Sequence, residues 1–212
     1  KRHAAKIQLG IDQLRKNDPV MRMLIRRCPP LTSLKLESNR FRMLVHSILS
    51  QQISVHVARL IRARLTGLVG PNGLTAEQIA AVGLNELREI GISGVKAGYL
   101  KDLAEKVSSG EVLLSQIGRR KDESIIRDLT IVKGIGVWTA QMFLMFSLGR
   151  IDVFPSDDHG VRSAIRKLYS LDNFPNKATS QRIAEPWRPY ATVATWYLWR
   201  SHELKSDIRG KC

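Results

Sequence analysis

Two groups of residues in this sequence have side chains and spacings that could perform chemistry. Gly134 and Gly136 form a Gly-x-Gly turn before a helical pattern, and the adjacent carboxylates Asp157 and Asp158 follow 22 residues later. Backbone N–H groups at the start of a helix can hold a phosphate oxygen. A positioned carboxylate can stabilise the positive charge that develops at a sugar carbon while a base departs.

The composition favours a polyanionic partner for this chemistry. The 212 residues include 34 Lys and Arg against 19 Asp and Glu, which gives a formal net charge of +15. Such an excess binds nucleic acid through phosphate neutralisation and counterion release. The hydrophobic content of 43% is that of a globular protein, and the length suffices for one large domain or two small lobes.

The sequence disfavours several other classes of protein. No apolar run reaches the roughly 18 residues of a membrane span, so no membrane partner is expected. Cys28 and Cys212 lack metal-ligand spacing, which disfavours a disulfide framework and an iron–sulfur centre. The expected compartment is therefore reducing: the cytoplasm or nucleoid of a bacterium, or the nucleus of a eukaryote.

The elements that must position these groups are helices. Apolar residues recur at helical spacing along the chain, and no segment alternates as a strand does, so the sequence predicts an all-α fold. Asp18-Pro19, Ser54, Ser93 and the capping box Thr75–Gln78 mark helix starts. The predicted helices cover residues 4–16, 18–27, 40–49, 54–68, 84–90, 93–107, 122–131, 137–148, 156–169, 178–185 and 190–203, with a short one opening at 75.

The glycine turn lies between two of these predicted helices, which makes a helix–hairpin–helix pattern. The N–H groups of the outgoing helix would bind a phosphate, and Lys133 adds a positive charge at the same place. Such a contact fixes position on a nucleic-acid backbone without reading sequence. An ordinary tight turn between packed helices is the alternative. A dinucleotide-binding fingerprint is disfavoured, because no strand precedes the turn and the third glycine is missing.

The paired carboxylates also have a structural alternative, because helix N-termini favour acidic residues as caps. Adjacent side chains at a helix start differ in direction by roughly 100°, so one carboxylate can cap while the other faces a cleft. Neither has a metal-ligand partner at helical spacing, which disfavours a metal-dependent nuclease.

Several segments of the chain resemble segments of a known family. The segment VKGIGVWTAQMFLMFSLGR followed by DVFPSDD resembles the helix–hairpin–helix superfamily of DNA glycosylases, in particular its alkylation-repair branch of 3-methyladenine DNA glycosylase II and fungal relatives. The blocks FRMLVHSILSQQIS, LREIGISGVKAGYLKDLA and WRPYATVATWYLWR follow the family's order, and the resemblance covers about residues 38–203. It implies two helical lobes with a cleft between them, one of residues 1–38 with 150–212 and one of 39–149, without the bacterial N-terminal β domain.

The resemblance also implies roles for individual residues. Asp158, the second residue of the pair, is the expected catalytic carboxylate. Trp138 stands where bifunctional relatives carry a Schiff-base lysine, which implies a monofunctional enzyme without lyase chemistry. Gln52 matches the side chain that wedges into the gap left by an extruded base. Two departures from the family are Ala191, where an Arg is expected, and His159, where an apolar residue is more usual.

The remaining expected site residues fall into three sets. Contacts to DNA are expected from Gln51, Gln52, Ser54, Lys133, Gly134, Gly136, Val137 and Thr139. A pocket for the base is expected from Trp199, by the register of the last helix, with Trp196 and Tyr197 as close alternatives, and from His159 and Trp138. No cofactor is required, but relatives hold a structural Na⁺ or K⁺ on hairpin carbonyls that match Thr130, Val132 and Ile135.

The function that the resemblance implies is base excision from damaged double-stranded DNA by a monomer. A monofunctional DNA glycosylase would extrude alkylated purines such as 3-methyladenine and 7-methylguanine and hydrolyse the N-glycosidic bond. Three alternatives stay open: a glycosylase for deaminated bases such as uracil or hypoxanthine, a non-catalytic helix–hairpin–helix DNA-binding module, and a nuclease or bifunctional lyase.

Overall fold

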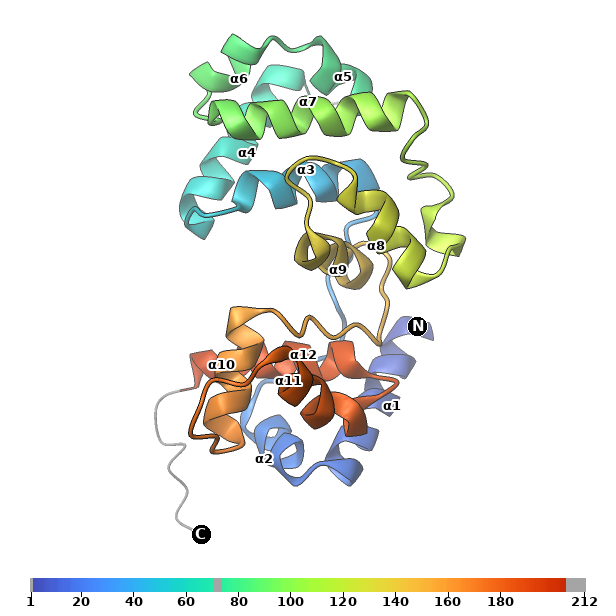
Figure 1. Cartoon of the computed structure of the whole chain (residues 1–212), viewed down its shortest axis with the longest axis vertical. Helices are drawn as coiled ribbons and strands as arrows, with labels where there is room; N and C mark the ends of the chain where they lie inside the picture. Colours follow the sequence, from blue (N-terminus) through green and yellow to red (C-terminus); the bar gives the residue numbers. More distant parts are fainter. Residues whose placement is uncertain (1, 71–73, 205–212) are drawn as a thin grey trace. The chain divides into compact units, whose positions relative to one another are not determined.

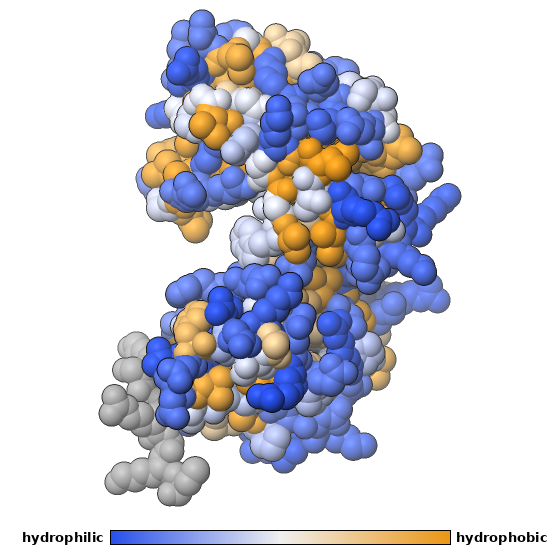
Figure 2. Space-filling view, in the orientation of Figure 1, coloured by the Kyte–Doolittle hydropathy of each residue, from blue (hydrophilic) through white to orange (hydrophobic). Residues whose placement is uncertain are grey.

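The computed structural model describes residues 2–70 and 74–204, and every regular element in these ranges is a helix (Figure 1). This confirms the predicted all-α fold. None of the described helices is long and apolar enough to cross a membrane. Hydrophilic residues cover most of the visible surface of each part of the chain (Figure 2).

The chain divides into two compact units. Unit 1 comprises Lys1–Lys35 and Gly149–Cys212, and unit 2 comprises Leu36–Leu148. The lobe predicted from the sequence began at 39 and ended at 149, so its boundaries differ from those of unit 2 by three residues and one residue. The predicted cleft between the lobes stays a prediction.

Unit 1 is a helical bundle formed by both ends of the chain. Helix α1 (Arg2–Asn17) packs against α2 (Pro19–Arg27) and α12 (Ala191–Arg200), and α12 also packs against α10 (His159–Leu168). Helix α11 (Lys177–Ala184) and the short 3-10 helices η2 (Glu185–Trp187) and η3 (Ser201–Glu203) complete the unit. Its core includes the fully buried Trp187.

Asp18 ties the core of unit 1 together. As predicted it caps α2, with Oδ1 accepting the N–H groups of Val20 and Met21 at 2.8 and 3.1 Å. Its other oxygen accepts from Trp187 Nε1 at 2.8 Å and from the hydroxyl of Tyr169 at 2.5 Å. A buried carboxylate is stable in the core only with such donors, so Asp18 is satisfied and structural.

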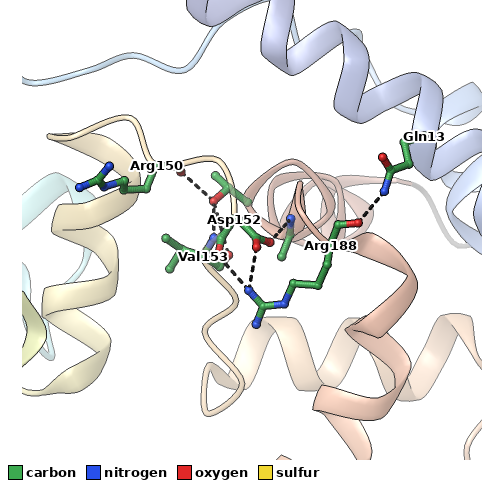
Figure 3. A network of polar contacts seen from close by, with 7 residues as sticks. Gln13, Arg150, Asp152, Val153 and Arg188 are labelled. Atoms are coloured by element: carbon green, nitrogen blue, oxygen red, sulfur yellow. Dashed lines mark hydrogen bonds and ion pairs between the residues drawn. The ribbon is translucent and has the colours of Figure 1, made fainter. Parts of the chain in front are cut away.

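A second polar network joins Asp152 and Arg188 near the start of α12 (Figure 3). The carboxylate of Asp152 pairs with Arg188 at 3.1 Å and accepts the N–H of Ala191 at 3.2 Å. Gln13 donates to the carbonyl of Arg188 at 2.5 Å. Ala191 is fully buried, so the larger side chain of an arginine would not fit at this position without a shift of its neighbours.

Unit 2 contains seven α-helices among its described residues. They are α3 (Arg40–Ser50), α4 (Val55–Val69), α5 (Ala76–Ala81), α6 (Leu84–Glu89), α7 (Gly94–Ser108), α8 (Asp122–Thr130) and α9 (Val137–Phe146), with the 3-10 helix η1 (Ile117–Arg119) between α7 and α8. Helix α3 packs against α4, α7 and α9, while α7 lies alongside α5 and α6 (Figure 1). The predicted capping box at Thr75 and Gln78 is present.

Candidate active site

Asp158 lies at the start of α10, where its position is fixed by two hydrogen-bond donors. Its Oδ1 accepts the backbone N–H of Val161 at 2.7 Å, which makes Asp158 the N-cap of α10. The same oxygen accepts from the indole Nε1 of Trp199, on α12, at 3.0 Å. The residue is half-buried. Two donors to one oxygen orient the carboxylate, and the positive end of the helix dipole favours its negative charge.

The structure identifies which member of the carboxylate pair caps the helix. Asp158 is the cap, as one of the two was expected to be, and the expectation that a carboxylate faces a cleft stays a prediction. Asp157 is exposed and lies 3.6 Å from the ammonium group of Lys177. Helix α10 begins only at His159, so both acidic residues precede it and the last of them takes the capping position.

Gly160 is a site residue that the sequence did not reveal. A Cβ at this position would lie 3.2 Å from Asp158 Oδ1 and 3.4 Å from Trp199 Cδ1. The absence of a side chain therefore lets the indole approach the carboxylate closely. Its carbonyl lies 2.9 Å from Nε2 of His202, which links this turn to η3. A glycine two residues after a cap is not by itself a recognisable signal.

The three aromatic residues predicted for the base pocket on α12 differ in position. Trp199 contacts Asp158 by the indole hydrogen bond. Trp196 is half-buried, with the guanidinium of Arg200 5.1 Å from its ring centroid. Tyr197 is 1% exposed, and its hydroxyl accepts the N–H of Leu31 at 3.3 Å. The prediction for Tyr197 is wrong, because its ring is packed into the core of unit 1.

His159 belongs to a small exposed cluster beside Asp158. Its ring lies 5.3 Å from the ring of Phe174, which is 37% exposed. The guanidinium of Arg162 lies over the same phenyl ring at 4.6 Å. A histidine at this position therefore stacks on Phe174 rather than packing into the core as an apolar residue would.

The predicted helix–hairpin–helix is present in unit 2 and depends on Gly134. Its φ is +81°, and a Cβ there would lie 2.1 Å from the ring of Tyr99 on α7. Gly136 is the N-cap of α9, has an ordinary φ of −92° and no neighbour within 4 Å of a Cβ. Position 134 therefore requires glycine for two reasons, its positive φ and the closeness of the Tyr99 ring. Gly136, in contrast, leaves open space at the start of α9.

The residues at the start of α9 differ in exposure. Val137 and Trp138 are 51% and 45% exposed, as a surface contact requires. Thr139 is 4% exposed, so its side chain faces the interior of unit 2, and a contact of its backbone N–H with DNA stays a prediction. Helix α9 has apolar residues nearly all round, and six of its ten residues are buried: Thr139, Ala140, Met142, Phe143, Leu144 and Met145.

Lys133 has a neighbouring carboxylate that the sequence did not reveal. Its N–H donates to Oδ2 of Asp102 at 2.8 Å, and its ammonium group lies 3.9 Å from Oδ1 of the same residue. Asp102 also pairs with Lys106 at 3.2 Å. The side chain of Lys133 is nevertheless 76% exposed, so its ammonium group can reach a phosphate outside the protein.

The loop between α3 and α4 holds a strained residue in the predicted wedge position. Gln52 is exposed and has a φ of +55°, in the left-handed region that costs a non-glycine residue about 1–3 kcal/mol. Gln51 donates through Nε2 to the carbonyl of Gly134 at 2.7 Å. Lys96 donates to the carbonyls of Leu49 and Gln51 at 2.9 and 2.6 Å. These bonds fasten the loop to both the hairpin and α7.

Ser54 and the hairpin carbonyls complete the predicted set. Ser54 is exposed and caps α4, with its hydroxyl accepting the N–H of Val57 at 3.3 Å. The carbonyl of Val132 accepts the N–H of Ile135 at 3.0 Å, and the cation site on the hairpin carbonyls stays a prediction. No group of three or more His, Cys, Asp or Glu side chains in the described ranges could hold a metal ion.

Unit 2 contains a pocket of about 690 Å³ beside the wedge loop. Residues of α3, α4 and α9, of the loop after α3 and of the segment before α3 line it: Glu37, Met43, His46, Ser47, Ser50, Gln51, Gln52, Arg62, Trp138, Thr139, Met142 and Phe146. Of the residues predicted for the base pocket, Trp138 is the one that lies here. His46, Ser50 and Arg62 could not be predicted from the sequence as pocket residues, because their convergence depends on how α3 packs against α4.

Burial in this pocket, together with the positive charges of Arg62 and Arg42, lowers the pKa of His46 to about 4. The imidazole is therefore neutral at pH 7. Because the unfolded chain takes up this proton near pH 6.5, the free energy of unfolding should fall as pH decreases from about 6.5 to about 4.

His46→Gln should therefore reduce the loss of stability between pH 7 and pH 5. Urea unfolding at both pH values measures this difference, and His56→Gln, at an exposed histidine on α4, is the control. An unchanged pH dependence in His46→Gln would show that this imidazole titrates normally in the folded protein.

Comparison with known proteins places the chain in a family. A model of the HhH-GPD superfamily of base excision DNA repair proteins matches residues 45–189, so the chain belongs to that superfamily. The predicted family is thereby confirmed.

Within the superfamily, the chain is similar to proteins named as 3-methyladenine glycosylases. It is 36% identical over 164 residues to DNA-3-methyladenine glycosylase 1 of Schizosaccharomyces pombe, covering 76% of this chain and 72% of that protein. A solved S. pombe 3-methyladenine DNA glycosylase in complex with abasic DNA has a TM-score of 0.82 at 32% identity, covering 92% of this chain and 97% of that one. YfjP of Bacillus subtilis is 33% identical over 178 residues, which are 81% of this chain but only 62% of YfjP.

Proposed function

We propose that this protein is a monofunctional DNA glycosylase that removes alkylated purines of the 3-methyladenine and 7-methylguanine type from double-stranded DNA. The observation that supports this most strongly is the carboxylate of Asp158, held by Val161 N–H and Trp199 Nε1 at the start of α10. This turn lies within the segment that matches the HhH-GPD superfamily. The names of the relatives supply the substrate class.

The proposed reaction needs little acid catalysis. Alkylated purines of this type carry a positive charge, so the base can leave with the electron pair of the N-glycosidic bond and become neutral. The positive charge then develops at the sugar C1′, where the carboxylate of Asp158 stabilises it. Water adds to C1′ and releases a proton, and the products are a free base and an abasic site.

The other residues have positioning roles in this proposal. The base must leave the stack to react, and Gln52 would fill the space that it vacates. The exposed N–H groups after Gly136 and the ammonium group of Lys133 would hold a backbone phosphate. Carbonyls of Thr130, Val132 and Ile135 would hold Na⁺ or K⁺ and support the shape of the turn.

The assignment as monofunctional rests on Trp138, since an indole cannot form a Schiff base with an abasic sugar. Borohydride reduction in the presence of abasic DNA should therefore give no covalent protein–DNA adduct. Trapping of an adduct would assign a lyase activity and a different nucleophile.

The substrate class is tested with duplexes that each carry a single altered base. Incubation followed by alkaline cleavage at abasic sites should show products for 3-methyladenine-type and 7-methylguanine lesions. Cleavage only at uracil, with none at methylated purines, would replace the proposal with a glycosylase for deaminated pyrimidines. DNA binding without any cleavage would favour a non-catalytic module.

A further inference from the structure

The wedge loop, residues 51–54 between α3 and α4, lies between two cavities of unit 2. Gln51 and Gln52 line the pocket of about 690 Å³ and also a second pocket of about 210 Å³. The second pocket is bounded by the segment that leads into α7, including Lys96. Residues that line two cavities have few packing neighbours, so polar contacts must fix the conformation of this loop.

Lys96, in the first turn of α7, supplies two of these polar contacts from one ammonium group. Its Nζ donates to the carbonyl of Leu49 at 2.9 Å and to that of Gln51 at 2.6 Å. Leu49 lies in the last turn of α3, and Gln51 is the C-cap of that helix. Carbonyls at a helix C-terminus lack partners within the helix and carry partial negative charge, so a lysine is well suited to bind them.

The bond to the carbonyl of Gln51 bears directly on the conformation of Gln52. This carbonyl and the backbone N of Gln52 belong to one planar peptide unit. Gln52 has a φ of +55°, which is strained for a residue with a side chain. An ammonium group that holds the carbonyl from α7 therefore resists the rotation of the peptide that would relieve the strain and move the Gln52 side chain.

We propose that Lys96 is a positioning residue that holds Gln52 ready to enter the gap left by an extruded base. The inference rests on the proposed function, in which Gln52 fills that gap. Lys96 acts through the loop and takes no part in bond cleavage. Its effect should be largest for a base that must be removed from a stable pair, because a weakly paired base leaves the stack at little cost.

Lys96→Met removes the donors but keeps an unbranched side chain, and Lys101→Met is its matched control. Lys101 lies on the same helix, and its ammonium group donates to the carbonyls of Ala80 and Val82 at the end of α5. Each variant therefore loses one positive charge and two hydrogen bonds to carbonyls at a helix C-terminus. Only Lys96→Met releases the carbonyls at the end of α3.

The measurement is the single-turnover rate of base release at saturating protein from two duplexes. One duplex carries a single 7-methylguanine paired with cytosine. The other carries an abasic analogue opposite the same lesion, so that no base pair has to open. The ratio of the paired to the unpaired rate reports extrusion, because a loss of folded protein or of catalytic power lowers both rates equally.

Lys96→Met should lower this ratio by about tenfold, while Lys101→Met keeps the wild-type ratio. Gln52→Ala should lower the ratio to a similar extent. The double variant Lys96→Met with Gln52→Ala should then lose little more than either single variant, because both act through the same side chain.

An unchanged ratio in Lys96→Met would overturn the inference, as would a double variant whose loss is the product of the two single losses. If Lys96→Met does not fold, Lys96→Gln replaces it. The amide keeps a donor for one carbonyl, so its ratio should fall in the same direction by a smaller factor, and an unchanged ratio would again overturn the inference. Failure of the wild-type protein to release 7-methylguanine from either duplex would instead refute the proposed function, and this inference with it.

Discussion

Asp158→Asn should reduce the rate of base excision by about 10²–10³-fold or more, with little loss of stability or of DNA affinity. The amide keeps an oxygen that can accept the N–H of Val161 and cap α10, so the helix start should persist. It lacks the negative charge that stabilises a cationic sugar. Single-turnover base release from methylated DNA measures the first effect, and binding to duplex DNA with an abasic analogue measures the second.

Asp157→Asn is the matched control for this variant. It removes the same charge one residue earlier, from an exposed side chain whose partner is Lys177. Its excision rate should stay within a few-fold of wild type. Near-normal base release by Asp158→Asn, or an equal loss in both variants, would contradict the assignment of Asp158 as the catalytic carboxylate.

Gly134→Ala should destabilise the hairpin and weaken DNA binding more than any other single change in the turn. The positive φ alone should cost an alanine about 1–2 kcal/mol. In addition, its Cβ would lie 2.1 Å from the ring of Tyr99, so α7 or the turn must shift. The shift would also disturb the carbonyl that accepts from Gln51. Urea unfolding and titration of an abasic-analogue duplex measure the two effects.

Gly136→Ala is the control, because its φ is −92° and its Cβ would meet no atom within 4 Å. We expect it to lose no more than about 1 kcal/mol, from the poorer N-cap. The double variant Gly134→Ala with Tyr99→Ala relieves the clash but not the backbone strain. If Gly134→Ala were as stable as Gly136→Ala and bound DNA equally well, the hairpin would not depend on this glycine.

Local signals in the sequence predicted most of the helices, because they depend on residues close together in the chain. Asp18, Thr75 and Gln78 cap helices as predicted. The sequence predicts that the helix beside the paired carboxylates starts at Ser156, whereas α10 begins three residues later at His159. A run of three polar residues offers several capping positions, and tertiary contacts such as the Trp199 hydrogen bond decide among them.

The parts of the site that could not be predicted depend on packing between elements. The burial of Tyr197 is decided by the segment around Leu31, 166 residues away. The neighbours of Gly134 and Lys133 are Tyr99 and Asp102 on α7, and neither position has a sequence signal of its own. Arg62 reaches the pocket of unit 2 because α4 packs on α3, and the sequence contains no local signal for that packing.

Release of free alkylated base from methylated double-stranded DNA by the purified protein tests the central claim most directly. The proposed function predicts that 3-methyladenine or 7-methylguanine appears in solution while the strands stay unbroken until alkali cleaves the abasic sites. Methylated DNA that keeps all its bases at saturating protein, despite tight binding, would contradict the assignment as a DNA glycosylase.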